Sequence, residues 1–176
     1  DMKMSLGENL IVTLFGESHG PAVGALIEGM PPNVEPDFEV LVADMISRRP
    51  GSGLASKRKE TDEVEFLAGI YDGKTTGMPI LLLIRNKDVR SKDYSFLPHQ
   101  PRPGHADFPI NVKTEGAADL RGGGSFSARL TAGLVAASSL TRTLIPEDWK
   151  IEATVGALGG MEGDEGRALA EEARKR

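Results

Sequence analysis

The apolar residues of this 176-residue sequence stand in short runs that glycine and proline interrupt, which limits the folds open to it. The chain holds 21 glycines and 11 prolines, residue types that weaken or end helices and strands from within. A membrane-spanning helix needs about 18 or more consecutive apolar residues, and no run is that long. The pattern therefore predicts a globular domain of short strands and helices joined by tight loops, with no membrane partner.

Several of the short runs have the composition and alternation that are typical of strands. Residues 9–15 and 22–27 are two such runs, and the short connection between them predicts an antiparallel pair. Further strands are expected at 64–70, where apolar residues alternate, at 80–84, a continuous apolar run, and at 150–158.

Three segments have the spacing of helices, and one long segment has no periodicity. Helices are expected at 37–48, at 126–144 and at 164–176. In the first helix, one face would carry Phe38, Leu41, Val42, Met45 and Ile46. In the second, one face would carry Leu130, Leu134, Ala137 and Leu144, and its small residues predict close neighbours. Residues 85–125 form a long polar connection, and such connections inside compact domains are usually functional.

The composition excludes several kinds of chemistry. Cysteine is absent, which rules out disulfides, thiolate zinc sites, iron–sulfur clusters and a cysteine nucleophile in this chain. No metal site is expected. A cytoplasmic location is predicted, although a chain without cysteine is compatible with other compartments. Aromatic residues make up 5% of the chain and the formal net charge is −5, so we expect no nucleic-acid partner.

Within this acidic chain, one stretch is basic. Residues 45–59 contain no acidic residue, and they include Arg48, Arg49, Arg58 and two lysines. A local cluster of this kind can concentrate a small anion. The alternative is a solvated loop with scattered cations, which is the commoner origin of a charged run.

Two of the three histidines lie in turns next to glycine. His19 stands in GESHG, between the first two expected strands, and His105 stands in RPGHAD, within the long polar connection. Glycine permits unusual backbone angles and the close approach of a ligand. Histidine can deliver a proton near neutral pH, for example to a leaving phosphate. The alternative for each is an ordinary surface histidine.

The sequence RGGGS at 121–125 leads into the expected helix at 126. A glycine-rich turn that opens a helix offers backbone N–H groups and the positive end of the helix dipole to a phosphate. It matches neither the dinucleotide-binding nor the P-loop motif. The alternative is a flexible loop in which Ser125 caps the helix.

Together these segments resemble one family, chorismate synthase. They occur in the family's order and spacing, and motifs such as GESHG, RPGHAD and GGGxFSAR are improbable together by chance. The matching stretches are FGESHGPAVGALIEGMPPNVEPD (15–37), RRPGSG (48–53), SKRKETDEVEFLAGIYDGKTTGMPI (56–80), DYSFLPHQPRPGHADF (93–108) and RGGGSFSARLTAGLVAA (121–137).

The resemblance implies an α+β fold, a β-α-β sandwich of the chorismate synthase type, in which antiparallel strands are layered against helices. It implies a carbon–oxygen lyase of the shikimate pathway to aromatic amino acids. This enzyme removes phosphate from 5-enolpyruvylshikimate 3-phosphate by anti-1,4-elimination to give chorismate. It further implies reduced FMN, with NADPH as a reductant only, and a cytoplasmic homotetramer. In the family's accepted picture, the flavin transiently donates an electron that weakens the C–O bond and recovers it as the C6 proton is lost.

The resemblance also implies roles for individual residues. His19 would be the acid beside the departing phosphate, and His105 would protonate or stabilise the reduced flavin. The residues expected to bind the substrate are Ser18, Arg48, Arg49, Arg58 and Arg129. The residues expected to contact the flavin are Ser125, Phe126 and Ser127.

The sequence departs from the family in two places and in its length. Leu54 stands near a position where many members have arginine, and Ser125-Phe126-Ser127 replaces an Arg-Ser-Ser segment. Members are longer, and their second half supplies further flavin contacts and an aspartate motif. We therefore expect residues 1–176 to form a single truncated N-terminal region with no separate second domain, inactive alone. The alternative function is an anion-binding or assembly fragment without catalysis.

Overall fold

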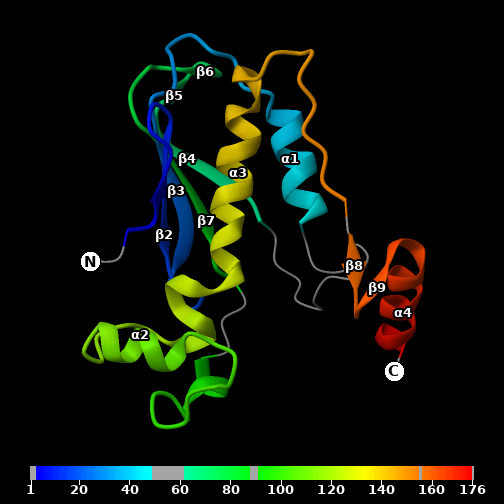
Figure 1. The fold of residues 1–176 in the computed structure, drawn as a ribbon. Coiled ribbons are helices and arrows are strands. Elements are labelled where there is room, and N and C mark those ends of the chain that lie inside the picture. Colours follow the sequence, from blue (N-terminus) through cyan, green and yellow to red (C-terminus); the bar gives the residue numbers. More distant parts are fainter. Residues whose placement is uncertain (1–2, 49–61, 88–90, 155, 176) are drawn as a thin grey trace.

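The computed structural model describes residues 3–48, 62–87, 91–154 and 156–175. Its centre is a five-stranded sheet with the strand order β1-β2-β3-β7-β4, in which all neighbouring strands are antiparallel (Figure 1). The strands are β1 (Ser5–Leu6), β2 (Ile11–Gly16), β3 (Ala22–Glu28), β4 (Val64–Ala68) and β7 (Ile80–Arg85). The predicted antiparallel pair is confirmed, since β2 pairs with β3 from Ile11 opposite Glu28 to Gly16 opposite Val23.

One face of this sheet forms the core. Alternate residues of a strand point to the same face, so β3 and β7 each place every second side chain there. The buried residues with no exposed surface on these two strands are Val23, Ala25, Ile27, Ile80, Leu82 and Ile84. The prediction that the apolar run 80–84 is an inner strand is confirmed, because β7 lies between β3 and β4.

Helices α1 (Phe38–Ser47) and α3 (Thr131–Thr141) lie on the same side of the sheet (Figure 1). The first begins where predicted, because the Asp37 carboxylate accepts hydrogen bonds from two backbone N–H groups of its first turn, each at 3.0 Å. Its predicted apolar face is only partly correct. Leu41 and Met45 are buried, but Val42 is 54% exposed and Ile46 48% exposed, because α3 and the sheet cover a narrower stripe.

Helix α3 packs closely on strand β3. A Cβ atom on Gly133 would lie 2.5 Å from the Gly24 carbonyl oxygen, so only glycine allows this approach. The predicted close packing by small residues is therefore confirmed. The predicted single helix over 126–144 is wrong at both ends, which are 3-10 turns, and Leu134 and Leu144 are exposed at 36% and 39%.

The remaining elements are short. Strands β5 (Ile70–Tyr71) and β6 (Lys74–Thr75) form one hairpin, and β8 (Ala157–Leu158) and β9 (Met161–Glu162) form another, followed by α4 (Gly163–Lys175). The expected strand at 150–158 is wrong for most of its length, since only its last two residues pair. The expected connection 85–125 contains the unpredicted helix α2 (Asp107–Lys113).

The predicted fold class, α+β with antiparallel strands layered against helices, is confirmed for the described residues. None of the helices in these ranges has the length and apolar character needed to cross a membrane.

Candidate anion-binding site

The turn between β2 and β3 carries Ser18 and His19, and it is held from two sides. The Ser18 N–H donates to the Gly124 carbonyl oxygen at 3.1 Å. The Asn86 side-chain amide donates to the carbonyl oxygens of Glu17 and Gly20, at 3.0 and 2.8 Å. Ser18 is 5% exposed and His19 6% exposed. The alternative of a surface histidine is therefore wrong for His19.

The glycine turn lies directly against these two side chains. Gly122, Gly123 and Gly124 all have positive φ angles, of 60°, 89° and 53°. A Cβ atom on Gly122 would lie 2.5 Å from His19 Cδ2, 2.7 Å from His19 Nε2 and 2.7 Å from Ser18 Oγ. Only a residue without a side chain allows this close approach, which brings two polar atoms, His19 Nε2 and Ser18 Oγ, together beside Gly122.

Ser18 Oγ is buried and has no hydrogen-bond partner among the described residues. Buried polar side chains in proteins are nearly always hydrogen-bonded, because an unpaired hydroxyl costs about 1–3 kcal/mol. A hydroxyl that stays unpaired beside a histidine and a glycine turn is therefore suited to a ligand oxygen.

The glycine turn does not open a helix in the way the sequence predicts. Ser125 Oγ donates to the Gly16 carbonyl oxygen at 3.1 Å, so Ser125 ties the turn to the end of β2. The cap falls on Ser127, whose hydroxyl accepts from the Arg129 N–H at 3.2 Å. The alternative of Ser125 as a helix cap is wrong, since three residues with positive φ lie just before it.

An aromatic ring that the sequence analysis missed packs against His19. The ring centroids of His19 and Tyr94 are 4.8 Å apart, with an angle of 82° between the planes. The Arg102 guanidinium lies 5.2 Å from the centre of the Tyr94 ring, and it forms two hydrogen bonds of 2.8 Å to the buried Asp107 carboxylate. Tyr94 lies in the long polar connection, which has no periodicity, so only the fold could reveal this contact.

His105 lies on the same loop but in a different environment. Its side chain is exposed, and its Nδ1 is 3.1 Å from the Pro103 carbonyl oxygen. The pKa of Asp107 is lowered, mainly by the hydrogen bond from Arg102 and to a smaller extent by the nearby His105. The loop therefore connects His105 to His19 indirectly, through Asp107, Arg102 and Tyr94.

Two of the predicted substrate-binding arginines share one carboxylate. Asp62 is 3% exposed; its Oδ1 accepts from Arg129 Nη1 at 2.5 Å, and its Oδ2 accepts from Arg48 Nη1. The other Arg129 nitrogens donate to Asn86 Oδ1 at 2.9 Å and to the Arg85 carbonyl oxygen at 3.3 Å. Asp62 and Asn86 flank expected strands and gave no signal in the sequence. Arg49 and Arg58, the other two expected cations, lie outside the described residues.

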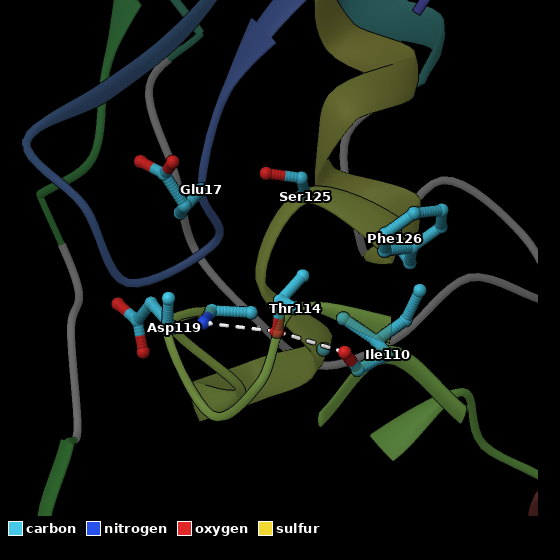
Figure 2. Close-up of a pocket in the computed structure, with 9 residues that line it drawn as sticks. Glu17, Ile110, Thr114, Asp119, Ser125 and Phe126 are labelled. Atoms are coloured by element: carbon cyan, nitrogen blue, oxygen red, sulfur yellow. Dashed lines mark hydrogen bonds between the residues drawn. The ribbon is translucent and has the colours of Figure 1, made fainter. Parts of the chain in front are cut away.

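Two of the three expected flavin contacts line a cavity of about 270 Å³ beside this turn (Figure 2). Ser125 and Phe126 form part of its wall, and Phe126 is 45% exposed. Figure 2 shows Glu17 and Asp119 on the opposite side from Phe126, with Thr114 of the α2 region between them. The third expected contact, Ser127, is the capping residue described above and is absent from this wall.

An ion pair sets the charge near the cavity. The Asp119 carboxylate accepts from the Arg121 guanidinium at 2.8 and 2.6 Å. These bonds, and in smaller part the proximity of His19, lower the pKa of Asp119. Asp119 therefore remains ionised at neutral pH and places a negative charge near His19.

Fold and site together define an α+β protein whose buried serine, histidine and glycine turn are suited to a phosphate-like anion. A sequence model of the chorismate synthase family matches residues 10–176. The chain belongs to the chorismate synthase family.

Individual relatives agree with this. Chorismate synthase of Aeropyrum pernix is 47% identical over 159 residues, which are 90% of this chain and 42% of the relative. That of Ralstonia pickettii is 51% identical over 149 residues, 84% of this chain and 40% of the relative. A crystal structure of a chorismate synthase, 30% identical, matches with a TM-score of 0.54 over 77% of this chain and 34% of the other. The chain thus spans about two fifths of the length of these curated relatives.

Proposed function

We propose that this chain contributes the phosphate-binding part of a chorismate synthase active site. The proposed reaction removes phosphate from 5-enolpyruvylshikimate 3-phosphate: the C–O bond to phosphate breaks, the C6 proton leaves and a new ring double bond forms. One observation carries the proposal beyond family membership. Ser18 Oγ, buried and unpaired among the described residues, and His19 Nε2 both lie against the glycine turn at Gly122.

Ser18 and His19 would act on the leaving group. His19 would hold a proton on Nε2 and pass it to the phosphate oxygen as the C–O bond breaks, since histidine is suited to proton transfer near neutral pH. The Ser18 hydroxyl would donate a hydrogen bond to another phosphate oxygen. The ionised Asp119 carboxylate would lie near His19 on the side of the cavity.

The residues present fit a part of a flavin site. Ligand pockets are typically about 300–1,000 Å³ and mainly apolar, and the cavity of about 270 Å³ is lined by Phe126, Ile110 and alanines. Phe126 would pack on the flavin ring, and His105, exposed on the adjoining loop, would hold a proton near it. Reduced FMN, when bound, would supply the electron density that assists cleavage of the C–O bond. NADPH is proposed as a reductant only.

The test uses this chain and a chimera that joins it to the remaining part of the Aeropyrum pernix relative. Chorismate formation from 5-enolpyruvylshikimate 3-phosphate with reduced FMN is followed by absorbance. We expect turnover by the chimera and loss of that turnover when His19 is replaced. A folded chimera that binds FMN and forms no chorismate would contradict the proposed reaction.

A homotetramer is proposed for the assembled enzyme, and the open face of the sheet supports it. No described helix covers this face in Figure 1, and it carries the partly buried Phe15, Leu26, Leu81 and Leu83. Exposed apolar faces of this kind often bind another subunit. Analytical ultracentrifugation of the chimera tests this, and a monomer at micromolar concentration would contradict it. The proposed location is the cytoplasm.

The alternative function is an anion-binding or assembly piece without catalysis. The small cavity favours this alternative for the 176-residue chain taken alone, because the described residues enclose too little volume to surround a flavin. Titration of the chain with FMN separates the two, since only a complete site binds the flavin tightly.

A further inference from the structure

The buried Asp62 carboxylate links Arg48 to Arg129 and, through Arg129, to the turn that carries Ser18 and His19. Arg48 and Asp62 stand on either side of residues 49–61, and the Asp62 carboxylate bonds the Arg48 guanidinium through one oxygen. The other oxygen bonds Arg129 at 2.5 Å. The side chain of Asp62 is 1% exposed, so this carboxylate is shielded from water.

The hydrogen bonds continue from Arg129 to the turn that carries His19. Arg129 Nε donates to Asn86 Oδ1 at 2.9 Å, and Asn86 Nδ2 donates to the carbonyl oxygens of Glu17 and Gly20. Ser18 and His19 lie between those two carbonyl groups. Two side chains therefore separate the Asp62 carboxylate from the backbone of the proposed catalytic turn.

The two arginines that meet at Asp62 are not equivalent. Each of the three nitrogens of the Arg129 guanidinium has a protein acceptor, and its side chain is 7% exposed. The Arg48 guanidinium bonds only Asp62 among the described residues, through Nη1, and its side chain is 18% exposed. Since a guanidinium has five N–H donors, Arg48 retains donors for an anion, whereas Arg129 is committed to the protein.

We propose that Asp62 is a positioning residue, which holds Arg48 for the substrate anion and, through Arg129 and Asn86, fixes the turn of Ser18 and His19. This inference rests on the phosphate site of the proposed function. It assigns Arg129 to the support of the site in place of direct contact with the substrate.

Charge and geometry predict opposite effects of Asp62 on anion binding. A carboxylate near an anion site repels the anion, so its removal should strengthen binding if only net charge matters. Without Asp62, however, two neighbouring guanidiniums repel each other and lose the acceptor that orients them. If Asp62 positions the site, its replacement by a neutral residue should weaken anion binding.

The experiment titrates the ¹⁵N-labelled 176-residue chain with inorganic phosphate and follows the backbone amides of Ser18, His19 and Gly122 by NMR. We expect wild type to respond, and Asp62→Asn to bind phosphate roughly tenfold or more weakly, the scale of one lost charge-assisted contact. Asp62→Glu should recover part of the affinity. The matched control is Asp44→Asn, because Asp44 also bridges two side chains, Ser139 and Arg142, but between α1 and α3.

Equal or tighter phosphate binding by a folded Asp62→Asn variant would overturn the inference, as would an equal loss in Asp44→Asn. If Asp62→Asn does not fold, the inference is tested on the spectrum of the wild-type chain. The Nε–H of Arg129 should then exchange with water far more slowly than the Nε–H of the exposed Arg85, and its signal should shift when phosphate is added. Fast exchange of the Arg129 Nε–H, or no shift, would overturn the inference. Lack of any phosphate response in wild type would contradict both proposals. A chimera that binds phosphate in this way but forms no chorismate would contradict the proposed reaction alone.

Discussion

The imidazole of His19 is buried between a tyrosine ring and a glycine that has no side chain to displace it. In the chimera, we expect His19→Ala to lower kcat by roughly 10²–10⁴, the usual contribution of a general acid. Substrate binding should change less, because Ser18 and the arginines remain. The control is His99→Ala, since His99 is an exposed histidine in the loop beyond Tyr94. Turnover at the wild-type rate in His19→Ala would contradict the assignment.

The Asp107–Arg102 ion pair predicts how acid affects stability. Hydrogen bonds from Arg102 lower the pKa of Asp107 in the folded chain below its unfolded value of about 3.9. The pair therefore stabilises the fold above that unfolded pKa, and the contribution is lost as the pH falls through the folded pKa. We expect Asp107→Asn to reduce the free energy of unfolding by about 1.5–3 kcal/mol at pH 6, and by much less near pH 2. Urea denaturation at the two pH values measures this, and an equal loss at both would contradict it.

At the residue scale, the sequence was informative where a motif is local. GESHG and RGGGSFS predicted Ser18, His19 and the glycine turn, and the fold brings them together because the Ser18 N–H bonds the Gly124 carbonyl oxygen. Asp62, Asn86 and Tyr94 could not be predicted in this way. Their roles depend on side-chain contacts across tens of residues, such as Arg129 with Asp62, and no periodicity records such contacts.

At the scale of elements, the glycine turn predicts a sharp difference between two alanine substitutions. Gly122 and Gly73 have φ angles of 60° and 74°, but a Cβ atom would clash with His19 and Ser18 only at Gly122, since nothing lies within 4 Å at Gly73. Both variants should lose roughly 1 kcal/mol of stability from backbone strain. Only Gly122→Ala should also abolish the phosphate-induced NMR shifts of the His19 amide. The same loss in Gly73→Ala would show that backbone strain, and not the clash with His19 and Ser18, controls the site.

Elements with a strong apolar pattern were predicted well, and those determined by tertiary contacts were not. β2, β3, β7 and α1 fall close to their expected ranges because burial against one face dictates their periodicity. Helix α2 was missed because it is short and contains a proline, and it begins at Asp107, whose carboxylate is held by Arg102. Residues 150–154 have strand-like composition, but no neighbouring strand pairs with them in the described structure.

For the whole molecule, the cavity beside the glycine turn predicts what this chain can do by itself. Its volume of about 270 Å³ lies just below the usual range for ligand pockets, about 300–1,000 Å³, and Phe126 on its wall is 45% exposed. A flavin ring held on one side only would leave much of its apolar surface in water. At about 25 cal/mol per Å², losing half of that burial costs several kcal/mol, and each 1.4 kcal/mol is about tenfold in affinity.

We therefore expect the 176-residue chain to bind FMN roughly 10²–10³ times more weakly than the chimera, and to form no chorismate with reduced FMN even at high concentration. Flavin fluorescence gives the two affinities, and absorbance follows the product. Supplying the remaining part of the Aeropyrum pernix relative as a separate polypeptide should restore some activity, because that polypeptide can then supply the other flavin contacts. The control is that polypeptide assayed alone. Sustained chorismate formation by the 176-residue chain alone would mean that its own residues complete the flavin site, and it would contradict the division of the site proposed above.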